Sequence, residues 1–137
     1  MPFFVGTPED LAWCGALVAV KLCAPEAVKS DALPIDALAE IDTSSIMTVI
    51  QEGVATSLGL KPAKRLKIPT LTRPTYEGYV YLIRLQFPEG NAIETPAIEV
   101  PYMLRDKVRI KCLIGRYVLK QIVFTYNGLT NTFSLKF

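Results

Sequence analysis

The stretch Ile35-Asp36-Ala37-Leu38-Ala39-Glu40-Ile41-Asp42-Thr43-Ser44-Ser45 decides the fold of this 137-residue chain. Its first seven residues form an apolar run, which predicts a buried strand over residues 35–41. An acid followed by small hydroxylated residues at the end of such a strand places a carboxylate where it can take part in a reaction. Asp42 is therefore the candidate catalytic residue, and Thr43, Ser44 and Ser45 are candidates for supporting it.

A second informative segment lies far along the chain. The apolar run Cys112-Leu113-Ile114 is closed by Gly115 and Arg116 and is followed by Tyr117-Val118-Leu119. The candidate supporting residues in this segment are Ile114, Gly115 and Arg116.

The composition favours a single compact domain. Half of the residues are hydrophobic and 20% are charged, which argues against disorder. The 15 basic and 13 acidic side chains nearly balance, and no basic cluster with interleaved aromatic residues occurs, so nucleic acid is not an expected partner. The chain has no histidine, which excludes Ser-His-Asp and Cys-His catalysis and most zinc sites.

The three cysteines and the N-terminal region bear on localisation. Cys14, Cys23 and Cys112 are scattered through apolar runs, which predicts buried free thiols, no metal site and a reducing, cytoplasmic compartment. The apolar segment from Leu11 to Ala24 contains Lys21 and is too short to span a bilayer. No basic residues precede it, so neither a signal peptide nor a membrane role is expected.

A pass along the chain predicts many short strands and one or two helices. Residues 1–14 are expected to form an irregular arm, either a genuine arm or a leftover linker, ahead of a domain over residues 15–137. In residues 47–60 the spacing of the apolar residues predicts a helix that ends at Gly59. The segment 61–78 is expected to be irregular or a loose hairpin. Strands are predicted over 16–22, 35–41, 79–87, 92–100, 107–114, 122–126 and 132–137, and a short helix over 116–121.

Taken in order, these segments resemble the retropepsin-like aspartic proteases, the retroviral enzymes and their cellular and prokaryotic relatives. In that family a hydrophobic strand delivers Asp-Thr/Ser-Gly-Ala, where this chain has Asp42-Thr43-Ser44-Ser45. Leu58-Gly59-Leu60 is similar to a string in prokaryotic members. The family's second signature corresponds to residues 113–119, and the segment 124–137 is similar to a closing hairpin. The match runs from about residue 16 to the end of the sequence.

The resemblance implies a mostly β fold: half of an acid-protease barrel, with one or two short helices, that forms a two-fold dimer. Its activity would be that of a homodimeric aspartic endopeptidase acting on extended peptides, without metal or cofactor. Two carboxylates, one Asp42 from each subunit, would share a proton and activate a water. The alternatives are a dimer with weakened catalysis that binds peptides or serves assembly, and an unrelated small β-barrel.

The resemblance also implies roles for the residues around Asp42. Thr43 would bond across the two-fold axis, or else be an ordinary turn residue. Ser44 stands where the family has glycine, and the Ser45 hydroxyl would donate to the carboxylate. In retroviral members the arginine equivalent to Arg116 pairs with an acid just after the catalytic motif. Here Ile46 and Met47 occupy those positions, so Glu52 is a guess for the partner of Arg116.

The flap is expected within residues 68–78, although a plain connecting loop is equally compatible with this segment. The candidate flap residues are Thr70, Leu71, Thr72 and Tyr76.

Overall fold

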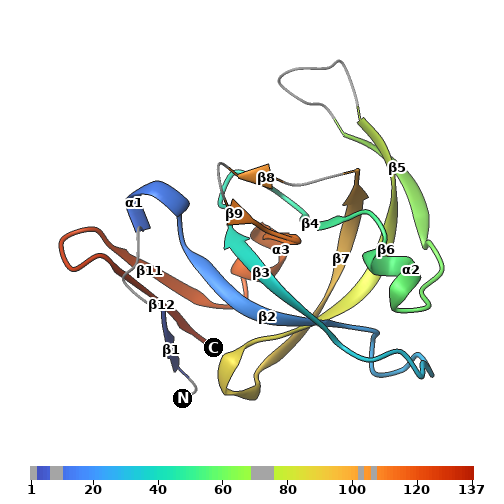
Figure 1. Cartoon of the computed structure of the whole chain (residues 1–137), viewed down its shortest axis with the longest axis horizontal. Helices are drawn as coiled ribbons and strands as arrows, with labels where there is room; N and C mark the ends of the chain where they lie inside the picture. Colours follow the sequence, from blue (N-terminus) through green and yellow to red (C-terminus); the bar gives the residue numbers. More distant parts are fainter. Residues whose placement is uncertain (1–2, 7–10, 69–75, 102–103, 106–107) are drawn as a thin grey trace.

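The computed structural model describes residues 3–6, 11–68, 76–101, 104–105 and 108–137. Strands dominate these residues, and the helices are short (Figure 1). The strands are β1 (Phe3–Val5), β2 (Leu17–Cys23), β3 (Ile35–Ile41), β4 (Thr48–Gln51), β5 (Lys64–Ile68), β6 (Tyr76–Gln86), β7 (Ala92–Val100), β8 (Leu104–Arg105), β9 (Val108–Arg109), β10 (Cys112–Ile114), β11 (Val123–Asn127) and β12 (Thr132–Lys136). The helices are α1 (Leu11–Cys14), α2 (Val54–Ser57), α3 (Arg116–Leu119) and the 3₁₀ turn η1 (Pro88–Gly90).

The main sheet closes into a small barrel. Its strand order is β2-β3-β10-β4-β7-β6-β5, and the additional pairing of β2 with β6 closes the ring and leaves β5 outside it. A second sheet, β1-β12-β11, extends to one side of this barrel (Figure 1). The mostly β, barrel-like fold predicted from the sequence is therefore confirmed.

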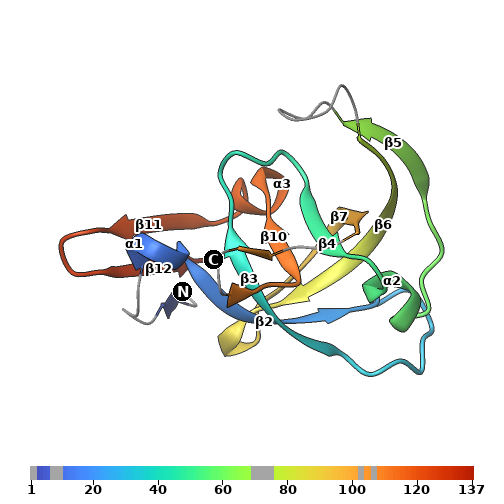
Figure 2. The same cartoon turned by 45° about the horizontal axis from the view of Figure 1, so that its top comes forward.

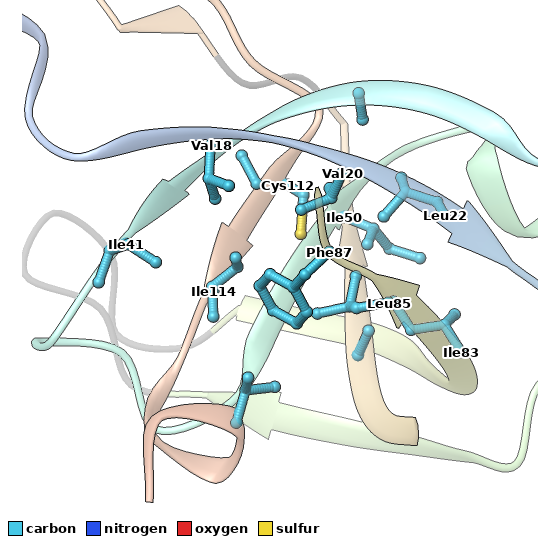
Figure 3. Close-up of a cluster of buried hydrophobic side chains, with 14 of the residues drawn as sticks. Val18, Val20, Leu22, Ile41, Ile50, Ile83, Leu85, Phe87, Cys112 and Ile114 are labelled. Carbon is cyan, nitrogen blue, oxygen red and sulfur yellow. The ribbon is translucent and has the colours of Figure 1, made fainter. Parts of the chain in front are cut away.

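The barrel interior explains why the apolar runs form strands. In β2 the side chains of Val18, Val20 and Leu22 are buried while those of Ala19 and Lys21 are exposed, as expected for a strand with one face on a core. Side chains from β2, β3, β4, β6 and β10 meet inside the barrel (Figure 3). The core therefore fixes the ends of β3 and β10, from which the candidate site emerges.

One connection in the barrel positions Asp42. Strand β10 lies between β3 and β4; it runs parallel to β3, with Ile114 opposite Ile41, and antiparallel to β4. The chain that leaves β3 therefore has to pass the end of β10 before it returns as β4. Figure 2 shows this connecting segment curving around α3.

The predicted helix over residues 47–60 is wrong in its first half. Thr48–Gln51 is strand β4, paired with both β10 and β7, and only Val54–Ser57 is helical. The β-branched residues Thr48, Val49 and Ile50 favour a strand, and pairing with distant strands outweighs the helical spacing of the apolar residues.

Other differences are smaller. Phe3–Val5 forms strand β1, paired with β12, so this part of the predicted arm is not irregular. The boundary at residue 15 stays a prediction. In segment 61–78 the loose-hairpin alternative is confirmed, because Lys64–Ile68 pairs antiparallel with β6. The predicted strand over 107–114 is interrupted, with Val108–Arg109 and Cys112–Ile114 in different sheets.

Candidate active site

Asp42 occupies the first position after the buried strand β3. Ile41 still faces the core, and the backbone N–H of Asp42 donates to the carbonyl of Ile114 over 3.0 Å, extending the parallel pairing by one residue. The Asp42 side chain is half-buried. The carboxylate therefore lies at the end of a rigid strand pair and remains accessible to solvent.

Ser44 holds the carboxylate. The backbone N–H of Ser44 donates to Oδ1 of Asp42 over 3.0 Å, and its hydroxyl donates to the same oxygen over 2.5 Å. The backbone of Ser44 has no positive φ; among the non-glycine residues that the structure describes, that region is occupied by Glu89 and Asn131. Serine in the usual glycine position therefore causes no strain of this kind, and it adds a donor.

The expected role of Ser45 is wrong. Its hydroxyl donates to the carbonyl of Met47 over 2.6 Å. A hydroxyl has a single proton to donate, so Ser45 does not also donate to Asp42. Ser45 instead shapes the loop, since its backbone N–H donates to the Asp42 carbonyl over 3.3 Å.

The second predicted segment packs directly against this loop. The N–H of Arg116 donates to the Ser45 carbonyl over 2.8 Å, and the N–H of Gly115 donates to Oγ1 of the buried Thr48 over 3.2 Å. A Cβ added to Gly115 would lie 2.5 Å from the backbone of Met47. Glycine is therefore required here by the close approach of two backbones, and the structure brings residues 42–45 and 114–116 together.

Arg116 binds the loop in a way that the sequence did not indicate. Its Nη1 donates to the carbonyl of Thr43 over 2.8 Å. The guess that Glu52 is its partner is wrong, because Glu52 lines a groove with Arg65 and Glu77, beside the β5–β6 hairpin. A role of Thr43 across a two-fold axis stays a prediction.

The hairpin of β5 and β6 projects from the barrel and is the element that corresponds to the predicted flap (Figure 1). Tyr76 is the first residue of β6, whereas Thr70, Leu71 and Thr72 lie outside the described residues. Near the base, Arg65 forms an ion pair of 2.7 Å with Glu77 and lies 5.4 Å from the ring centroid of Tyr79. The flap role itself stays a prediction.

A small apolar cluster links this hairpin to the loop. Met47, Val80 and Ile98 are buried together, apart from the barrel core, with Val49 and Leu66 packed against them. The sequence predicts a helix over residues 47–60, and that prediction indicates neither this cluster nor the acceptor role of Thr48. The run of β-branched residues Thr48-Val49-Ile50 was the available signal for a strand.

Other chemistries have little support among the described residues. Burial raises the pKa of the Cys112 thiol to about 12 and also raises the pKa of Cys23, so neither thiol is activated as a nucleophile. Within the described part of the chain, no cluster of three or more potential metal ligands occurs. The same part contains no helix that is long and apolar enough to cross a bilayer.

Comparison with solved structures agrees with the architecture. A retropepsin-like aspartic protease from Rickettsia conorii superposes with a TM-score of 0.57 at 12% identity, covering 99% of this chain and 91% of that protein. The foamy viral protease-reverse transcriptase, determined in complex with an RNA/DNA hybrid, matches with a TM-score of 0.53 at 16% identity. That match covers 77% of this chain, which spans only 11% of the viral protein.

A third match, to EIAV protease in complex with the inhibitor HBY-793, has a TM-score of 0.46 at 12% identity, covering 72% of this chain and 92% of that protein. No family model and no curated protein matches the sequence. The first two structural matches show that the fold is retropepsin-like, as the sequence strings predict.

Proposed function

We propose that the protein is an aspartic endopeptidase that works as a homodimer and hydrolyses extended peptides. The observation that supports this most strongly is the Asp42 carboxylate. Two donors of Ser44 hold it at the end of a parallel strand pair, within a retropepsin-like fold. A carboxylate that is fixed in orientation and half-exposed is suited to act on a bound water.

The mechanism requires a second carboxylate. Two carboxyl groups about 3 Å apart share one proton, because both cannot be ionised at that separation. The loop over residues 42–47 carries one acid, Asp42. We therefore assign the second carboxylate to Asp42 of a second copy, related by a two-fold axis.

The chemistry then follows from the shared proton. The ionised carboxylate removes a proton from water, and the resulting hydroxide attacks the carbonyl carbon of the scissile peptide bond. The protonated carboxyl donates its proton to the carbonyl oxygen, which gives a tetrahedral intermediate. The C–N bond then breaks as the carboxyl that took the proton from water gives it to the leaving amine. The other carboxylate recovers a proton from a hydroxyl of the intermediate as the new carboxyl group forms. The peptide would lie extended beneath the β5–β6 hairpin and bind largely through its backbone. No metal or cofactor takes part.

The first test is a matched pair of substitutions. Asp42→Asn should abolish cleavage of a denatured protein at about pH 4–6, and a pepstatin-type inhibitor should block the wild type. Asp36→Asn is the control, because Asp36 is exposed on β3 and pairs with Lys21 over 2.9 Å, outside the loop. Cleavage that persists in Asp42→Asn would refute the proposal.

The second test addresses the dimer. Wild-type and Asp42→Asn chains are mixed in equal amounts and allowed to exchange. Activity is compared with that of the same total amount of wild-type chain. If each site needs both carboxylates, only the wild-type homodimers are active and about one quarter of the activity remains. If each chain acts independently, about one half remains. Retention of one half would show that one chain suffices.

Ser44 also supports a second candidate, a dimer with weakened catalysis that binds peptides or serves assembly. Its hydroxyl lies against the carboxylate, on the exposed loop where water would bind. This candidate predicts peptide binding that Asp42→Asn leaves intact, without turnover by the wild type.

We also propose a cytoplasmic location. The three cysteines are free, which supports a reducing compartment.

A further inference from the structure

Two exposed apolar side chains lie beside the Asp42 loop. Ile46 is 56% exposed and Tyr117 is 39% exposed, and the two are adjacent because the N–H of Tyr117 donates to the Ile46 carbonyl over 3.0 Å. The next residue, Met47, is only 9% exposed and packs in the small apolar cluster. The exposed pair, here called the Ile46–Tyr117 patch, is therefore not part of either core.

The patch is fixed to the loop that carries Asp42. Arg116 immediately precedes Tyr117. Its backbone N–H donates to the carbonyl of Ser45, and its guanidinium donates to the carbonyl of Thr43. The Lys120 ammonium lies 5.3 Å from the centroid of the Tyr117 ring, a cation–π distance that restrains the ring. The patch and the Asp42 carboxylate are consequently held by the same bonds. A partner that fixes the position of the patch therefore also fixes the position of the carboxylate.

We infer that the Ile46–Tyr117 patch contacts a second copy of this chain beside the two-fold axis and supplies an apolar part of the dimer interface. This inference depends on the proposed function, which brings two Asp42 carboxylates to about 3 Å. Ile46 is four residues from Asp42, within about 14 Å even for extended chain. The bond from Ser45 N–H to the Asp42 carbonyl makes the separation shorter than that limit.

An apolar patch suits this place for an electrostatic reason. A two-fold axis brings a surface against the same surface of the other copy, so a charge near the axis meets a like charge. The two carboxylates already impose such a repulsion. Ile46 and Tyr117 add attraction by burial without adding charge, and burial of apolar surface is not weakened by salt as ion pairs are.

The experiment is sedimentation of the full chain over a concentration series. The neutral truncations Ile46→Ser and Tyr117→Ser should each raise the dimer Kd about tenfold or more, as expected for apolar anchors. Both side chains are exposed in a single chain, so the circular dichroism spectrum should keep its native shape, while Tm should fall only as far as the weaker dimer requires. The wild-type Kd should not rise between about 0.05 and 0.5 M NaCl.

Two kinds of control variant test whether the effect depends on apolar surface and whether it depends on the position of the patch. Ile46→Val and Tyr117→Phe retain the apolar surface and should keep Kd within about twofold of the wild type. Leu33→Ser makes the same kind of truncation at a side chain that is 83% exposed, outside the loop. It should also leave Kd unchanged.

The outcomes distinguish this inference from the proposed function. A wild-type dimer whose Kd is unchanged by Ile46→Ser and Tyr117→Ser overturns the inference alone. A higher KM with unchanged Kd also overturns it, because the patch would then contact substrate. A wild type that remains monomeric at about 100 μM, with a pepstatin-type inhibitor present, overturns the proposed function and this inference with it.

Discussion

Ser44 donates both its backbone N–H and its hydroxyl to the same carboxylate oxygen, Oδ1 of Asp42, over 3.0 Å and 2.5 Å. A glycine in this position would supply only the first of these donors. The second donor restricts rotation of the carboxylate, so Ser44 is a positioning residue for the proposed reaction.

Removal of the Ser44 hydroxyl should slow the reaction without unfolding the protein. A hydrogen bond to a charged group contributes about 1.5 kcal/mol, so Ser44→Ala should lower kcat roughly tenfold. Ser44→Gly should behave similarly, because it lacks the same hydroxyl. The free energy of unfolding should fall by no more than about 1.5 kcal/mol, the contribution of the lost bond, so the variant stays folded. Ser57→Ala, at the exposed end of α2, is the control; wild-type kcat in Ser44→Ala would contradict the assigned role.

Gly115→Ala should destabilise the fold. The added Cβ would lie 2.5 Å from the Met47 carbonyl carbon and oxygen, which are backbone atoms that cannot rotate away. A cost of about 2–3 kcal/mol is expected, measured by denaturant unfolding. Gly128→Ala is the matched control: its nearest neighbour would be a Tyr126 ring carbon at 3.6 Å, and its φ is not positive. Equal losses in the two variants would show that close approach is not the cause.

Arg116→Ala should disturb the Asp42 loop, because it removes the bond from the guanidinium to the Thr43 carbonyl. We expect kcat/KM to fall about tenfold through misplacement of the carboxylate, and stability to fall by about 1 kcal/mol. Arg116→Lys should retain part of the activity. Glu52→Gln should have no effect on either quantity, and an equal loss in that variant would restore Glu52 as the relevant partner.

Cys112 should resist modification in the folded protein. Burial raises the pKa of its thiol from 9.0 to about 12, so the thiolate is scarce at pH 8. Alkylation followed by peptide mapping should label Cys112 only after unfolding. Because the unfolded chain loses this proton from about pH 9 and the folded chain does not, stability should fall by up to about 1.4 kcal/mol per pH unit between pH 9 and 12. Rapid labelling of folded protein would contradict the burial.

Part of this fold could be predicted from local patterns. The apolar run over 35–41 predicts a strand, the polar turn between 79–87 and 92–100 predicts two strands joined by a short connection, and the glycine before Arg116 marks the end of a strand. These patterns place β3, β6, β7, β10 and α3 close to where they are found.

The remainder depends on pairings that no local pattern contains. Strand β1 is specified by its pairing with β12, more than 120 residues away, and β4 by contacts with β7 and β10. The partner of Arg116 is a backbone carbonyl, which any residue at position 43 would provide. Likewise, the sequence Ser44-Ser45 does not say which hydroxyl faces the carboxylate.

The parallel pairing of β3 with β10 has a consequence during protein synthesis. Residues 39–41 pair with residues 112–114, so the contacts that hold the Asp42 loop join segments about 70 residues apart in the order of translation. While residues 112–116 are still in the ribosome, the nascent chain has Asp42 but lacks Gly115 and Arg116 to hold the Asp42 loop. The geometry of the Asp42 loop can therefore form only after residues 112–116 have emerged and paired with β3.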